Sequence, residues 1–197
     1  MAHDKIAVVD FGGQYAHLIA AKIRRLHVLA EILQPEDPVE KFAGFKGIVL
    51  SGSPALSAYG EDSAYDKRIF DLPVPILGFC FGHQEIAKHY GGAVEHTKRE
   101  YGPATLEIRG ACPVFAGLEP KETVWMSHGN TVTVLPPGFQ ETGVSRVGGG
   151  EAHPNAAIAH EGLKRWRSLS ARRVSRARCF PWNRLVSKRT FVATSNR

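Results

Sequence analysis

Short apolar runs alternate with amphipathic stretches over the first 90 residues of the chain. Apolar runs rich in β-branched residues predict strands buried on both faces, at residues 6–10, 27–33, 47–50 and 75–79. Between these runs, apolar side chains recur at helical spacing, most clearly at Ala16, Ile19, Ala20 and Ile23. Helices are expected at residues 14–26, 65–71 and 82–90. This alternation predicts an α/β fold with an open, mostly parallel sheet flanked by helices.

The pattern becomes more strand-like after residue 91. Further strands are expected at residues 104–108, 123–126, 131–135 and 156–159, with turns or loops at 136–138 and 148–150. Beyond residue 162 the sequence has neither a helical nor a strand period. We therefore expect one domain over residues 1–162, followed by a poorly ordered tail over residues 163–197.

The net charge of +6 is unevenly distributed along the chain. Residues 163–197 contain 11 Lys and Arg side chains and no Asp or Glu, which leaves 14 basic and 19 acidic side chains in residues 1–162. A basic tail can bind nucleic acid or an anionic surface. The interpretation we favour is an unstructured tail without an evolved partner, because its aromatic residues do not follow the pattern of a known nucleic-acid-binding module.

Composition and cysteine usage narrow the class of protein. A chain of 197 residues with 43% hydrophobic residues suits one sizeable packed domain. No apolar run is long enough to span a bilayer, and the N-terminus does not resemble a secretory signal. The three cysteines, Cys80, Cys112 and Cys179, lack the spacing of a metal site or a disulfide framework. We expect a cytoplasmic protein that binds no metal and does not insert into a membrane.

The segment most indicative of chemistry is PILGFCFGHQ, residues 75–84. Cys80 follows an apolar strand, precedes a helix and has Gly78 and Gly82 two positions to either side, which is the cysteine counterpart of a nucleophile elbow. A helix N-terminus favours the reactive thiolate, and the Phe81 N–H is placed to hold an oxyanion. The alternative is a buried structural cysteine, and this motif alone does not exclude it.

Taken together, several segments resemble class I glutamine amidotransferases. PILGFCFGHQ resembles their nucleophile motif, and GIVLSGSP, residues 47–54, resembles their oxyanion loop. Three further segments resemble the GMP synthase subfamily: VDFGGQYAHLIAAKIR near the start, KREYGPATL at residues 98–106, and VWMSHGN at residues 124–130. The resemblance covers roughly residues 5–162 and implies a flavodoxin-like α/β fold.

The resemblance also implies a role for particular residues. Cys80 would attack the side-chain amide of glutamine and form a glutamyl thioester. The backbone around the oxyanion would come from Gly52, Ser53 and Phe81. Glutamine would be contacted by Gln84, Ser127 and His128. Asn130 stands where the family usually has Asp, which is expected to weaken binding of the substrate's amino group.

The base of the family's triad has no counterpart at the matching position. The family carries a His-x-Glu after the segment that PNAAIA, residues 154–159, resembles, but here no His follows His160 and no Asp or Glu follows Glu161. His153 precedes this segment, and His160 has the wrong spacing. His128 could be read as the base, although the motif makes it a pocket residue. We interpret the Arg-rich sequence from about Leu163 as a frameshift product or a disrupted terminus; a natural basic extension is the alternative.

Two functions from different classes follow from these observations. The first is the glutamine amidotransferase component of GMP synthase, which supplies ammonia for the conversion of XMP to GMP on an ATP-pyrophosphatase domain or subunit. ATP and Mg²⁺ would then bind to that partner, since this chain has no phosphate-binding motif and no evident cofactor site. The second is an amidotransferase-like binding protein without turnover, as the missing His-x-Glu would suggest.

Overall fold

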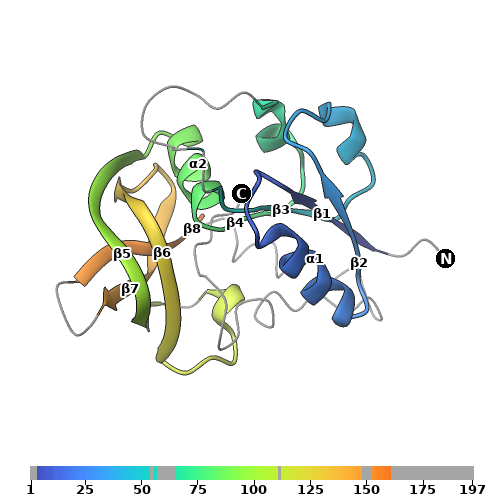
Figure 1. Cartoon of the computed structure of the whole chain (residues 1–197). Coiled ribbons are helices and arrows are strands. Elements are labelled where there is room, and N and C mark those ends of the chain that lie inside the picture. The colour runs from blue at the N-terminus through green and yellow to red at the C-terminus, as the bar shows by residue number, and fades with distance from the viewer. Residues whose placement is uncertain (1–3, 54–55, 57–64, 111, 148–151, 161–197) are drawn as a thin grey trace.

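The computed structural model describes residues 4–53, 56, 65–110, 112–147 and 152–160. Two four-stranded sheets make up the fold, and α2 lies between them (Figure 1). The first half contains β1 (Lys5–Val9), α1 (Ala16–Arg25), β2 (Leu29–Leu33), β3 (Gly47–Leu50), β4 (Ile76–Gly78) and α2 (Phe81–His89). The second half contains β5 (Ala93–Ile108), β6 (Lys121–Val134), β7 (Phe139–Val147) and β8 (Ala152–His160). Short 3-10 helices occur at Val39–Phe42, Lys67–Asp71 and Pro113–Phe115.

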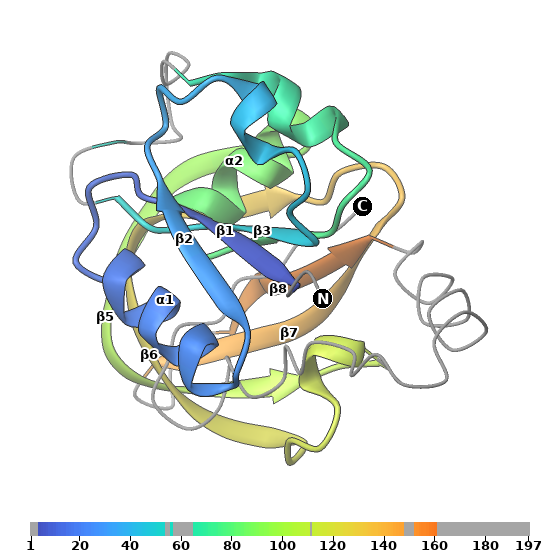
Figure 2. The ribbon, with the colours of Figure 1, turned by 90° about the vertical axis from the view of Figure 1, so that its right-hand side faces the viewer.

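The first sheet is parallel, in the order β2-β1-β3-β4. Helices α1 and α2 lie on opposite sides of it (Figure 2). Because successive strand residues point to opposite faces, Val8 and Val49 pack in one buried cluster with α1, while Val9 and Leu50 pack in another with α2. Both faces of the central strands are therefore buried, which explains their continuous apolar composition.

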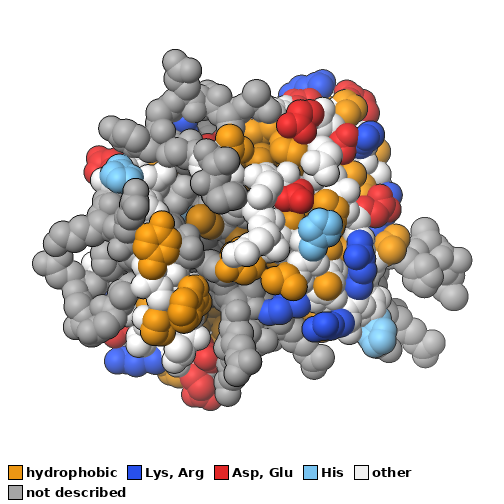
Figure 3. Space-filling model, viewed as in Figure 1, with side chains coloured by type: hydrophobic (Ala, Val, Ile, Leu, Met, Phe, Trp, Pro, Cys, Tyr) orange, Lys and Arg blue, Asp and Glu red, His pale blue; other side chains and the backbone are white. Residues whose placement is uncertain are grey.

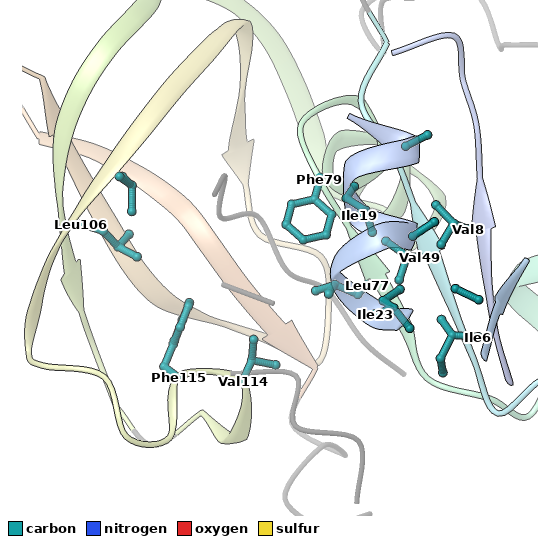
Figure 4. Close-up of a cluster of buried hydrophobic side chains, with 14 of the residues drawn as sticks. Ile6, Val8, Ile19, Ile23, Val49, Leu77, Phe79, Leu106, Val114 and Phe115 are labelled. Carbon is teal, nitrogen blue, oxygen red and sulfur yellow. The ribbon is translucent and has the colours of Figure 1, made fainter. Parts of the chain in front are cut away.

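Helix α1 has the apolar face that its sequence predicts. Ala16, Ile19, Ala20 and Ile23 are all buried. In Figure 4, Ile19 and Ile23 lie against the side chains of the parallel sheet. The last turn of α1 carries Lys22, Arg24 and Arg25, and basic side chains gather over this end of the helix in Figure 3. Cationic side chains there complement the negative end of the helix dipole.

The second sheet is antiparallel, in the order β6-β5-β7-β8. Its inner face contributes Leu106, which lies near Val114 and Phe115 of the neighbouring 3-10 segment (Figure 4). Strands β5 and β6 are long and pair along most of their length, with irregularities near Ala93 and between His96 and Glu100. One end of this pair reaches the carboxyl-end edge of the parallel sheet, where it faces α2.

The parallel sheet confirms the predicted fold class, whereas several expectations for the second half were too fragmentary. The strands expected at 123–126 and 131–135 form the single strand β6, and the one expected at 104–108 is the end of β5. Strand β7 was not predicted, because its buried positions include the polar Thr142 and Ser145 and so lack an apolar alternation. The helix expected at 65–71 is a 3-10 turn.

Other expectations fall outside the described residues. The loop at 148–150 and the tail at 163–197 belong to this group. Among the helices that are described, none has the length and apolar content that a membrane span requires. The poor order expected for the C-terminal tail stays a prediction.

Candidate functional site

A cavity of about 770 Å³ opens at the carboxyl ends of β1, β3 and β4. In a parallel sheet of this order, that edge beside β1 and β3 is where ligands of doubly wound folds bind. The cavity is lined by Gly12, Gly13, Gln14, Tyr15, Leu18, Ile19, Ala21, Lys22, Arg25, Gly52, Ser53, Leu56, Phe79, Cys80, Phe81, Gln84, Tyr101, Gly129 and Asn130. Five of the seven residues that the sequence singled out therefore lie at one cavity: Gly52, Ser53, Cys80, Phe81 and Gln84.

Cys80 occupies a strained turn between β4 and α2. Its φ of 51° and ψ of −112° lie in a region that L-residues rarely adopt. The turn is closed by the Gly82 N–H, which donates to the Phe79 carbonyl at 3.0 Å and the Ser51 carbonyl at 3.2 Å. This is the geometry of a nucleophile elbow, in which the strain projects one side chain out of the turn.

The flanking glycines are required by close packing. A methyl group on Gly78 would lie 2.5 Å from the carbonyl carbon of Gly82 and 2.5 Å from the His83 nitrogen. A methyl group on Gly82 would lie 2.5 Å from the Leu50 Cβ and 2.6 Å from its carbonyl oxygen. Strand β4, helix α2 and the end of β3 therefore approach one another more closely than any side chain allows.

The loop after β3 lies directly against Cys80. A methyl group on Gly52 would lie 3.3 Å from the Cys80 Cβ and 3.9 Å from its sulfur. Ser51, which is fully buried, holds this loop: its N–H donates to the Val9 carbonyl at 3.1 Å, and its Oγ accepts the Phe11 N–H at 3.1 Å. The backbone of residues 51–53 is thus fixed beside the sulfur by the loop that follows β1.

The far wall of the cavity comes from the antiparallel sheet. The Gln84 side chain is buried, and its Nε2 donates to the Asn130 carbonyl at 2.8 Å. The Oδ1 of Asn130 lies 3.0 Å from Nδ1 of His96. Ser127 and His128 lie on β6 opposite Tyr101 and Glu100, but their side chains are outside the described part of the structure.

The electrostatics of Cys80 differ from the sequence-based expectation. Burial raises the pKa of the Cys80 thiol, and the hydrogen bond from the Phe81 N–H lowers it by less. The helix N-terminus therefore acts in the expected direction, but desolvation of the thiolate outweighs it. Sequence reasoning identified the helix and could not assess how deeply the sulfur would be buried.

We expect Cys80 to react with iodoacetamide along a pH profile shifted to the alkaline side of an exposed cysteine. The raised pKa means that little thiolate exists near neutral pH, so the rate should climb as the pH rises through the folded-state pKa. Mass spectrometry of the peptide that carries Cys80 measures the rate, with the urea-unfolded chain as reference. A midpoint at or below that of the unfolded chain would contradict the burial effect.

None of the histidines whose side chains the structure describes lines the cavity. His83 is buried on α2, and His89 stacks on Phe70 with ring centroids 4.2 Å apart. His153 and His160 lie on β8, opposite Ser145 and Phe139, and their side chains are not described. The absence of the family's His-x-Glu thus remains a statement about the sequence.

Sequence reasoning missed several cavity residues. Tyr15, Leu18 and Lys22 of the α1 region line it, although the helix pattern suggested only a packing role. Gly13 was also missed. A methyl group on Gly13 would collide with the Gly52 carbonyl oxygen, so this glycine lets the loop after β1 approach the loop after β3. The FGG run at the end of the first strand was the available indication.

The fold and the strained cysteine together define an α/β protein with a nucleophile-elbow site. The family model for class-I glutamine amidotransferases matches residues 7–167. Because this match covers most of the chain, the chain belongs to the class-I glutamine amidotransferase family.

Individual relatives narrow the comparison. The GMP synthase (glutamine-hydrolyzing) of Pyrobaculum aerophilum is 47% identical over 148 residues, which cover 74% of this chain and 29% of the relative. That of Bacillus mycoides is 42% identical over 164 residues, covering 81% of this chain and 31% of the relative. The chain therefore spans between a quarter and a third of the length of these relatives.

A solved structure supports the same relationship. The crystal structure of a GMP synthase subunit from Thermoplasma acidophilum superposes with a TM-score of 0.63 at 28% sequence identity. The superposition covers 75% of this chain and 80% of that protein.

Proposed function

We propose that this chain is the glutamine-hydrolysing component of a GMP synthase. The observation that carries the proposal is Cys80, held on a strained elbow in a cavity and packed against the backbone of Gly52. A strained, cavity-facing nucleophile beside a glycine-rich loop suits attack on an amide carbonyl. The names of the two relatives, both glutamine-hydrolysing GMP synthases, support the choice of glutamine as substrate.

The proposed reaction forms and then hydrolyses a thioester. The Cys80 sulfur bonds to the amide carbon of glutamine, the carbon–nitrogen bond breaks, and the thiol proton leaves with the nitrogen as ammonia. Water then cleaves the thioester to release glutamate. Backbone N–H groups at Gly52, Ser53 and Phe81 would stabilise the oxyanion, which is worth about 3 kcal/mol for each well-placed donor.

Recognition of glutamine would involve both sheets. We assign Gln84, Ser127 and His128 to the binding of glutamine. Of these, Gln84 lies at the cavity and is oriented by the Asn130 carbonyl. Asn130 replaces an acidic residue, so the amino group of the substrate would meet a neutral amide instead of a carboxylate.

The remainder of the reaction would take place on a partner in the cytoplasm. Ammonia would pass to an ATP-pyrophosphatase domain or subunit that binds ATP and Mg²⁺ and aminates XMP to GMP. The amidotransferase family model accounts for residues 7–167, which supports assigning the ATP-dependent step to a partner outside these residues. We propose no cofactor for the chain itself and no role in membrane or nucleic-acid binding.

Glutamate release from glutamine tests the proposal directly. We expect the chain to release glutamate in the presence of a GMP-forming ATP-pyrophosphatase, and Cys80→Ala to abolish it, because no other described side chain at the cavity is a comparable nucleophile. A folded chain that releases no glutamate under either condition, yet binds glutamine, would instead be an amidotransferase-like binding protein. The missing His-x-Glu would then be its cause.

A further inference from the structure

A buried carboxylate lies on α2 immediately after the proposed glutamine contact. Glu85 is 1% exposed, and its Oε2 accepts hydrogen bonds from the Tyr65 hydroxyl at 2.8 Å and from Lys67 Nζ at 2.6 Å. Lys67 Nζ also lies 4.0 Å from the centroid of the Tyr65 ring. A buried ion pair of this kind is costly to desolvate and is weak evidence for a purely stabilising role.

The location of this cluster along the chain is informative. Tyr65 and Lys67 stand where the backbone returns to the fold after the loop that begins at Gly52. Glu85 belongs to the helix that begins directly after Cys80. The cluster therefore joins the distal end of the proposed oxyanion loop to the helix that carries the elbow.

A continuous set of contacts leads from the cluster to the oxyanion loop. The Tyr65 ring packs edge-on against Phe11 at 5.2 Å, and Phe11 packs edge-on against Phe81 at 5.1 Å. The Phe11 N–H donates to Ser51 Oγ at 3.1 Å, and that hydroxyl donates in turn to the Gly52 carbonyl at 3.1 Å. Phe11 thus contacts both groups that flank Cys80.

We propose that Glu85 is a positioning residue, which holds Tyr65 and, through Phe11, sets the Gly52–Ser53 backbone relative to the Cys80 sulfur. The inference rests on the proposed function. Glu85 does not touch the substrate. Its effect is geometric, because oxyanion donors act only when they lie at hydrogen-bond distance from the position that the oxygen will occupy.

The test separates oxyanion geometry from the general state of the thiol. The probe is the chloroketone analogue of glutamine, 2-amino-5-chloro-4-oxopentanoate, whose ketone oxygen would occupy the oxyanion position. The Cys80 sulfur displaces chloride, a sulfur–carbon bond forms, and the thiol proton passes to solvent. Iodoacetamide alkylates the same sulfur without resembling glutamine. The ratio of the two rates therefore reports the recognition and oxyanion geometry, and protection by glutamine reports binding.

Glu85→Gln is the informative variant, because glutamine keeps the shape and an acceptor for Tyr65 while losing the charge that holds Lys67. We expect its chloroketone rate to fall about tenfold, in line with the cost of a displaced catalytic group, while its iodoacetamide rate changes by less than about twofold. The matched control is Glu141→Gln, which breaks a 2.7 Å ion pair with Arg109 away from the cavity. It should change neither rate.

The outcomes distinguish this inference from the proposed function. Chloroketone labelling of the unmodified chain that is no faster than iodoacetamide labelling, or that glutamine does not slow, overturns the proposed function. Rapid, glutamine-protected labelling that Glu85→Gln leaves unchanged overturns only the positioning role. If Glu85→Gln fails to fold, Tyr65→Phe removes just the hydroxyl and should lower the same ratio; an unchanged ratio there has the same meaning.

Discussion

Gly78→Ala is expected to destabilise the fold by about 3 kcal/mol or more, the range for severe overpacking of a buried site. The new methyl group would lie 2.5 Å from backbone atoms of Gly82 and His83 in the first turn of α2. Backbone atoms cannot rotate aside as a side chain can, so α2 must move away from β4. Urea unfolding followed by circular dichroism measures the loss.

The control for this substitution is Gly44→Ala. Gly44 also has a backbone that favours glycine, with a φ of +80°, but a methyl group there would meet no atom within 4 Å. Its cost should be limited to the left-handed backbone strain, about 1 kcal/mol. The close approach of β4 and α2 would be disproved if the two alanine variants lost similar amounts of stability.

Cys80→Gly is expected to remove the reactivity of the site and to stabilise the fold at the same time. The φ of 51° and ψ of −112° at Cys80 suit glycine and strain any residue with a Cβ. Relief of that strain should make Cys80→Gly about 1–2 kcal/mol more stable than Cys80→Ala, within the range for a residue held in a sparsely populated region.

Cys80→Ala is the necessary reference for this effect, because it removes the sulfur and retains the Cβ. Both variants should fail to react with the glutamine chloroketone, while their unfolding midpoints differ. Equal midpoints would mean that the turn relaxes without a cysteine, and that the strain belongs to the side chain's contacts and not to the backbone.

The first half of the fold could be predicted because local pattern and tertiary packing agree there. The strand at Gly47–Leu50 is a continuous apolar run, buried on both faces of a parallel sheet. The spacing of Ile19 and Ile23 predicts the one helix face that packs on that sheet. The glycines around Cys80 indicated a tight turn, and the structure has one at that position.

The second half was harder because its strands carry little periodic signal. Strand β7 buries Thr142 and Ser145 between β5 and β8, where neighbours across the sheet decide burial. The same limit applies at the site. The Gln84–Asn130 hydrogen bond joins residues 46 positions apart, and the Lys67–Glu85 pair joins residues 18 apart. Such contacts depend on the assembled fold, and so does the burial that raises the Cys80 pKa.

The bond from Gln84 to the Asn130 carbonyl has a consequence for how this site could be re-engineered. The elbow, the loop after β3 and α2 all belong to the parallel half, whereas the opposing wall is a main-chain carbonyl of the antiparallel half. Since a carbonyl oxygen is offered by every residue type, β6 could be redesigned around position 130 without losing that partner of Gln84. Directed evolution of substrate preference therefore has a separable target, the β5–β6 ribbon, that leaves the reactive cysteine in place.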